Sequence, residues 1–110
     1  MNNFLMNATL PWHDLGGGVS RQVMGYNDDL MIVKFKFTKG GAGAPHHHIH
    51  SQGAVVISGS FELTINGESR ILEAGDGYFV EPDVVHSALC LEDGILIDAF
   101  NPSRRDFLKA

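Results

Sequence analysis

The sequence has few basic residues, and this limits the partners that it can bind. Its 110 residues include 8 Lys and Arg against 13 Asp and Glu, which gives a formal net charge of -5. A nucleic-acid surface needs clustered positive charge, so we expect no nucleic-acid partner. An acidic small substrate is compatible with this balance, because one buried arginine binds a carboxylate whatever the net charge of the protein.

Cysteine and long apolar runs are also scarce. The single cysteine, Cys90, excludes an intramolecular disulfide and is compatible with a reducing compartment. No apolar stretch approaches the roughly 20 residues that span a bilayer. Residues 1–14 lack the basic segment and apolar run of a signal peptide. We therefore expect a cytoplasmic protein without membrane contact, and a single domain over residues 1–110.

The first strand signal is an alternating apolar run. Residues 30–37 (LMIVKFKF) place Val33, Phe35 and Phe37 on one face, with lysines between them. A period of two residues is typical of a half-buried strand. We expect the glycine-rich residues 38–45 to form a loop.

Two further runs are separated by a glycine. Residues 54–57 (AVVI) are predicted to form a short strand closed by Gly59, and residues 61–65 (FELTI) alternate as a second strand. Asn66-Gly67 follows directly, and this dipeptide suits a two-residue type I′ hairpin turn.

The remaining strand signals continue to the end of the chain. They are residues 68–72 (ESRIL), 77–82 (GYFVEP), 84–91 (VVHSALCL) and 95–100 (ILIDAF), with turns predicted at 74–77, at Pro82-Asp83 and at Glu92-Asp93-Gly94. Strand signals that recur about every 8–12 residues indicate an all-β sandwich or closed barrel. Only residues 103–110 suggest a turn of helix, with Ser103 as its N-cap.

Five of the six histidines lie in two places, 46–50 and 86. On an extended strand His46 and His48 point to one face and His47 to the other. Two imidazoles on one face begin a transition-metal site, which needs further donors from elsewhere in the chain.

The spacing of these residues is more specific than their number. Gly40, His46, His48, Gln52 and Gly59 follow the pattern G-x5-H-x-H-x3-E-x6-G, with Gln in the place of Glu. Residues 75–86 (GDGYFVEPDVVH) resemble the second motif of the same family, which ends on His86. The chain thereby resembles the cupin superfamily. This resemblance implies a double-sheet (jelly-roll) barrel that holds one divalent transition metal, Zn, Ni, Mn or Fe, on His46, His48, Gln52 and His86.

The second motif departs from the family at three positions. Glu81 replaces a proline, Asp83 replaces a turn glycine and Cys90 replaces an asparagine. Aspartate is one of the few residues that tolerate positive φ, so we expect the turn at Asp83 to survive.

Gln52 has a consequence for the metal. Three imidazoles and an amide are neutral, so a bound M²⁺ keeps its full charge and favours Lewis-acid chemistry over dioxygen activation.

Other readings of the histidine cluster remain open. The tract could be an exposed loop that binds metal without function. We expect His50 to line the mouth of the site, with direct ligation as the alternative, and His47 to face outward. Cys90 is expected to be a small buried residue.

Asp98 is a lone carboxylate in the apolar run 95–100, and burial of such a group is costly unless it is paired or protonated. One interpretation is a salt bridge to Arg104 or Arg105 that anchors the tail. The other is a general acid–base group beside the metal. Phe100 would then give an apolar wall to a sugar, and Arg104 a planar fork to a substrate carboxylate.

A closer resemblance covers nearly the whole chain. Residues 25–37, 43–52, 58–68 and 91–108 are similar to the pectin-degradation cupins, and the departures lie at His47 and in residues 53–56. The resemblance implies ring opening of 4,5-unsaturated monouronates to linear keto-uronates, with catalytic roles for Asp98, Phe100 and Arg104, and a homodimer. Two rivals are a non-catalytic sugar-acid or metal sensor and a small metal-dependent dioxygenase. Pectin-derived and alginate-derived substrates are not distinguished.

Overall fold

The computed structural model describes residues 3–108 and is built almost entirely of strands. The described residues form β1 (His13–Gly16), β2 (Val19–Tyr26), β3 (Met31–Phe37), β4 (Ala42–His46), β5 (Ser51–Ile65), β6 (Glu68–Glu73), β7 (Gly77–Val80), β8 (His86–Asn101) and a 3-10 helix, η1 (Arg105–Leu108). The predicted all-β architecture is confirmed. No helix within residues 3–108 is long and apolar enough to cross a membrane.

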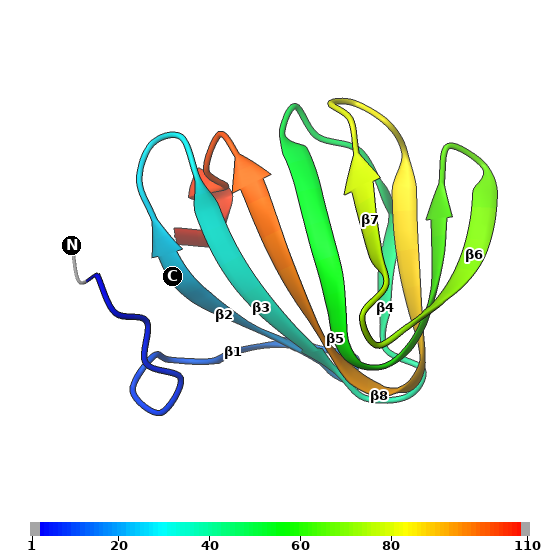
Figure 1. Cartoon of the computed structure of the whole chain (residues 1–110), viewed down its shortest axis with the longest axis horizontal. Coiled ribbons are helices and arrows are strands. Elements are labelled where there is room, and N and C mark those ends of the chain that lie inside the picture. The colour runs from blue at the N-terminus through cyan, green and yellow to red at the C-terminus, as the bar shows by residue number, and fades with distance from the viewer. Residues whose placement is uncertain (1–2, 109–110) are drawn as a thin grey trace.

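Two long strands, β5 and β8, organise the fold. They pair antiparallel from Ser51 opposite Asn101 to Ile65 opposite His86. The first half of β5 also pairs with β7, and the last half of β8 pairs with β3, which continues the layer to β2 and β1. The other halves pair with β6 and β4 and form a second layer. β5 and β8 bend between the layers, so the sheet has the shape of a basket (Figure 1).

The bends of β5 and β8 lie at two glycines. Gly59 has φ +81°, and a Cβ there would collide with the carbonyl oxygen of Asp93, while a Cβ on Gly94 would collide with that of Ser58. The register shifts between Val56 and Ser60 mark the same place. The predicted chain breaks at Gly59 and at 92–94 are therefore wrong, because the glycines let two continuous strands bend against each other.

Other local predictions have mixed outcomes. Asn66 and Gly67 have φ values of 51° and 80°, as a type I′ turn requires, and Asp83 has φ 65°. The loop expected over 38–45 is shorter, because β4 already begins at Ala42. The helical turn is present as η1, but the Ser103 hydroxyl donates to the Asn27 carbonyl and does not cap it.

The core lies between the two layers. One cluster of buried side chains comprises Phe37, Val56, Phe61, Leu63, Cys90 and Leu96, and a second comprises Met31, Val33 and Phe100. The alternation predicted for β3 is confirmed, because Val33 and Phe37 are buried while Lys36 is exposed. The alternation predicted for residues 95–100 is also confirmed, because Leu96, Asp98 and Phe100 all face inward. Cys90 is buried, as expected.

Candidate metal centre and adjoining cavity

Strand pairing brings three histidines together. His46, the last residue of β4, lies directly opposite His86, the first residue of β8. His48 lies in the loop after β4, where its carbonyl accepts a hydrogen bond of 2.7 Å from the Asp83 backbone N–H. One ring nitrogen from each histidine lies within 4.8 Å of the others. The turn at Asp83 thus holds His48 beside the two strand histidines.

Backbone carbonyls set the protonation of all three rings. Nδ1 lies 2.7 Å from the Ala44 carbonyl in His46, 3.1 Å from that of His50 in His48, and 2.9 Å from that of Val84 in His86. A carbonyl only accepts, so Nδ1 carries the proton and Nε2 presents a lone pair. Burial lowers the pKa of His48 and of His86, which favours this neutral form.

Gln52 completes the group from the opposite layer. Its Oε1 lies 3.0 Å from Nε2 of His48 and 3.1 Å from Nε2 of His86. Its Nε2 donates to Oδ1 of Asp98 at 3.0 Å. Oε1 of Gln52 and the Nε2 atoms of the histidines are therefore all acceptors, and they face one another without a proton between them. A divalent cation satisfies such a set of neutral N and O donors, so these residues fit a transition metal.

The other two histidines of the cluster lie outside this group. His47 is exposed, as expected, with Nδ1 4.0 Å from the Asp83 carboxylate. His50 packs edge-on against His48 and Phe100, with ring centroids 5.3 and 6.4 Å away. The expectation that His50 lines the mouth of the site stays a prediction.

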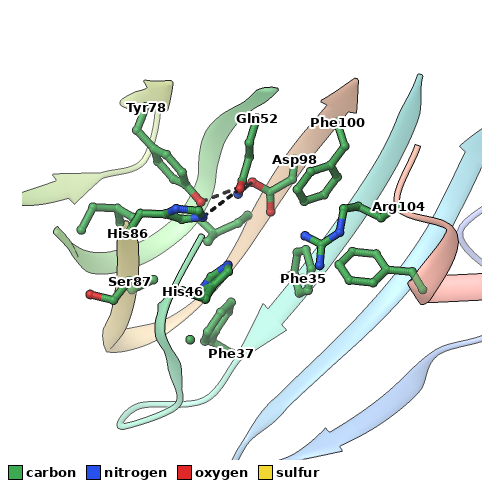
Figure 2. A pocket seen from close by; sticks show the side chains of 15 residues that line it. Phe35, Phe37, His46, Gln52, Tyr78, His86, Ser87, Asp98, Phe100 and Arg104 are labelled. Carbon is green, nitrogen blue, oxygen red and sulfur yellow. Dashed lines mark hydrogen bonds between the residues drawn. The ribbon is translucent and has the colours of Figure 1, made fainter. Parts of the chain in front are cut away.

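A cavity of about 190 Å³ adjoins the histidines. His46 and His86 line one side of it, Phe100 and Arg104 line the other, and Asp98 lies between them (Figure 2). The three residues that the sequence suggested for catalysis are thus gathered around one space.

Asp98 is 2% exposed and accepts hydrogen bonds from Gln52 at 3.0 Å and from the Tyr78 hydroxyl at 3.3 Å. Burial raises the pKa of Asp98 to about 6, against the opposing effect of these hydrogen bonds and of Arg104. The interpretation of Asp98 as the partner of a salt bridge to Arg104 or Arg105 is wrong, because Arg104 pairs with Asp106 and Arg105 pairs with Asp28.

Arg104 is held beside Phe100 by the tail of the chain. Its Nε and Nη2 donate to the two carboxylate oxygens of Asp106 at 3.1 and 2.9 Å. The guanidinium lies 4.3 Å from the ring centroid of Phe107 and 5.2 Å from that of Phe100. The hydrogen bonds from Arg104 also lower the pKa of Asp106. Arg104 is therefore a fixed cation at the cavity wall.

Sequence reasoning missed Tyr78 and Phe107. Tyr78 shares a strand face with the buried Val80, and this was the available signal, but its partner Asp98 lies on another strand. Phe107 lies in the short tail helix, and no pattern in the sequence points to its contact with Arg104.

Comparisons with known proteins agree with the fold and identify the family. Residues 33–97 match the model of the cupin domain family. The chain is 46% identical over 110 residues to the pectin degradation protein KdgF of Dickeya dadantii, covering 98% of this chain and all of that protein.

Solved structures give the same picture. An RmlC-like cupin from Shewanella frigidimarina superposes with a TM-score of 0.95 at 44% identity, covering 97% of this chain and 96% of that one. KdgF from Halomonas sp. superposes with a TM-score of 0.93 at 37% identity, covering 97% and 99%. The chain belongs to the cupin superfamily and, within it, to the family of the pectin degradation protein KdgF.

Proposed function

We propose that the chain is a metal-dependent enzyme that opens the ring of 4,5-unsaturated monouronates to linear keto-uronates. One observation carries the proposal. A buried carboxylate, Asp98, lies between the converging metal-binding atoms and the Arg104 guanidinium, and it lines one cavity together with His46, Gln52, His86 and Arg104. The kinship with KdgF, a pectin degradation protein, supports a substrate from this class.

The cavity favours a single sugar acid. Its 190 Å³ is smaller than the roughly 300–1,000 Å³ of sites for drug-sized ligands. Phe100 and Arg104 both line the cavity. In the proposal Phe100 supplies apolar contact to the sugar ring, and Arg104 supplies N–H groups to its carboxylate. We therefore infer that the substrate is a monouronate and that its carboxylate lies against Arg104.

Asp98 supplies the base in the proposed reaction. It accepts the proton of the anomeric hydroxyl, C1 becomes an aldehyde, and the bond between C1 and the ring oxygen breaks. The ring oxygen remains on C5 as an enolate. C4 then takes a proton from solvent to give the C5 ketone and Asp98 releases its proton to solvent, so the net reaction is an isomerisation. A pKa of about 6 suits a group that accepts a proton near neutral pH.

His46, His48, Gln52 and His86 would hold the metal in this proposal. A divalent ion bound there would polarise substrate oxygens as a Lewis acid. We propose Zn, Ni, Mn or Fe as the ion, and three imidazole ligands favour Zn, Ni or Fe among these.

The test follows the C4=C5 absorbance of an unsaturated monouronate prepared with a polysaccharide lyase, against a protein-free control. We expect metal-loaded protein to accelerate its loss, chelator to abolish the acceleration and added metal to restore it. Asp98→Asn should lower kcat about 10²- to 10⁴-fold, the usual contribution of a general base.

The rivals predict other results. Tight uronate binding without turnover would identify a sensor, and iron-dependent oxygen uptake would identify a dioxygenase. Either result, together with no acceleration by metal-loaded protein, would overturn the ring-opening proposal.

We also propose that the protein is a cytoplasmic homodimer, as family kinship suggests. Three apolar side chains are 45–62% exposed on the outer face of β5 and β7, namely Val55, Ile57 and Phe79. A second copy would bury them. Sedimentation equilibrium should show a dimer, and Val55→Lys should dissociate it while Ile71→Lys, on exposed β6, should not. A wild-type monomer would contradict the proposal.

A further inference from the structure

Gln52 lies between two groups that require opposite ends of its amide. Oε1 faces Nε2 of His48 and of His86 at 3.0 and 3.1 Å, and the amide nitrogen faces Oδ1 of Asp98 at 3.0 Å. The side chain is buried, at 7% exposure. Water therefore has little part in deciding which end of the amide faces which neighbour.

Asp98 selects between the two orientations of this amide. If the amide were rotated by 180°, Oε1 would meet Oδ1 of Asp98 and the NH₂ group would face the three histidines. Two oxygens in a buried contact repel each other, and an NH₂ group cannot bind a metal. The hydrogen bond to Asp98 thus holds Oε1, the ligand atom, toward the histidines.

Tyr78 fixes Asp98 in turn. In the strand register Tyr78 lies opposite Ala54, and Ala54 lies opposite Asp98 on the other side. The methyl group of Ala54 is small enough for the Tyr78 hydroxyl to reach Oδ1 of Asp98, at 3.3 Å. Both described hydrogen bonds of Asp98 therefore end on Oδ1, and Oδ2 is left for the cavity (Figure 2).

We propose that Tyr78 and Oδ1 of Asp98 act as a positioning pair that orients the Gln52 amide oxygen toward the three histidines. The two oxygens of Asp98 then have separate tasks, since Oδ1 orients a metal ligand while Oδ2, if the proposed function holds, accepts the substrate proton. The pair also accounts for Gln at position 52, because a glutamate there would place a second carboxylate against Asp98.

Ni²⁺ affinity, measured by calorimetry without substrate, tests the pair. Asp98→Asn keeps an acceptor oxygen for Gln52 and Tyr78, so its affinity should stay close to that of the wild type. Asp98→Leu removes the acceptor, and its affinity should fall about 10- to 100-fold, as when other partners of metal ligands are lost. Tyr78→Phe should weaken Ni²⁺ binding less than Asp98→Leu does. Tyr26→Phe, at the exposed end of β2, is the matched control and should change nothing.

A second background separates orientation from general damage to the fold. In Gln52→Ala protein the ligand is already absent, so Asp98→Leu and Tyr78→Phe should have no further effect on Ni²⁺ affinity. Equal losses in both backgrounds would overturn the proposal, as would an Asp98→Leu variant that binds Ni²⁺ like the wild type. If Asp98→Leu does not fold, Tyr78→Phe in the two backgrounds decides alone, and unchanged affinity in both would overturn the proposal.

Turnover gives the remaining readout. With an active wild type, Tyr78→Phe should lower kcat about 10- to 100-fold at nearly constant KM, because Asp98 is less well oriented while Arg104 is untouched. An unchanged kcat would remove Tyr78 from the pair. A wild type without uronate activity would overturn the proposed function. The positioning pair would then be tested by the Ni²⁺ affinities alone.

Discussion

Asp98 lies on the inner face of β8 with Leu96 and Phe100, and this location decides how it responds to pH. Its pKa is raised from 3.8 to about 6 by burial, so the folded protein holds this proton over a pH range in which the unfolded chain has lost it. The contribution of protonated Asp98 to the stability of the folded state is therefore complete below about pH 4, and it is lost as pH rises through about 6.

We predict that the stability of metal-free wild type relative to Asp98→Asn falls by about 2 kcal/mol between pH 4 and 6.5, which is most of the effect of the raised pKa. Urea unfolding at several pH values measures this difference. His48, His50 and His86 have lowered pKa values and change stability in the opposite direction, but they are common to both proteins. The exposed Asp29→Asn is the control, and a flat difference for Asp98→Asn would contradict the prediction.

Arg104 is the second residue whose surroundings make a prediction. Its guanidinium is stacked on two phenylalanines and its side chain is only 14% exposed. A lysine has neither the planar fork nor the stacking surface.

Arg104→Lys should raise KM for the unsaturated uronate about 10- to 100-fold, the equivalent of one lost charge-assisted hydrogen bond. Steady-state kinetics measures it. Arg105→Lys is the matched control, because Arg105 pairs with the exposed Asp28. Equal effects of the two substitutions would show that Arg104 does not bind the carboxylate.

At the scale of elements, the bends of β5 and β8 determine whether the two layers can face each other. Gly59 and Gly94 lie against each other at this crossing, where neither tolerates a side chain. Gly75 has a similar backbone, with φ +95°, but has open space around it.

We predict that Gly59→Ala lowers the free energy of unfolding by about 2–5 kcal/mol, combining the left-handed backbone with overpacking. Gly75→Ala should cost only about 1–2 kcal/mol, because the backbone effect acts alone. Urea unfolding of the two variants gives the comparison. Similar losses in both would show that the contact between β5 and β8 adds nothing.

At the scale of the whole molecule, the candidate metal centre joins the two layers. His46 and His86 belong to one layer and Gln52 to the other. An ion bound by all of them would hold the layers together, and it would stabilise the folded state by mass action.

Zn²⁺ at 100 times its Kd should therefore raise the free energy of unfolding by about 2.7 kcal/mol. Thermal unfolding with and without the ion measures the shift. His48→Ala should abolish it, whereas His47→Ala should retain it, because His47 points to solvent. A shift that persists in His48→Ala would place the ion elsewhere.

The sequence predicted strands well and their ends poorly. Residues 30–37 and the Asn66-Gly67 turn could be recognised, because alternation and turn chemistry are local properties. The continuity of β5 through Gly59 could not, since a glycine that ends a strand and one that bends it look alike in sequence. The choice depends on Gly94, a residue far along the chain.

The same division applies to the site. The sequence by itself determined which residues are candidates for the site: resemblance to the two cupin motifs indicated His46, His48, Gln52 and His86, and a lone carboxylate in an apolar strand indicated Asp98. Only the tertiary structure decided which partner each group has, such as Tyr78 on Asp98 and Asp106 on Arg104. The physical reason is that side-chain chemistry and spacing are written along the chain, whereas hydrogen-bond partners follow from register between strands, which the packing of the whole barrel sets.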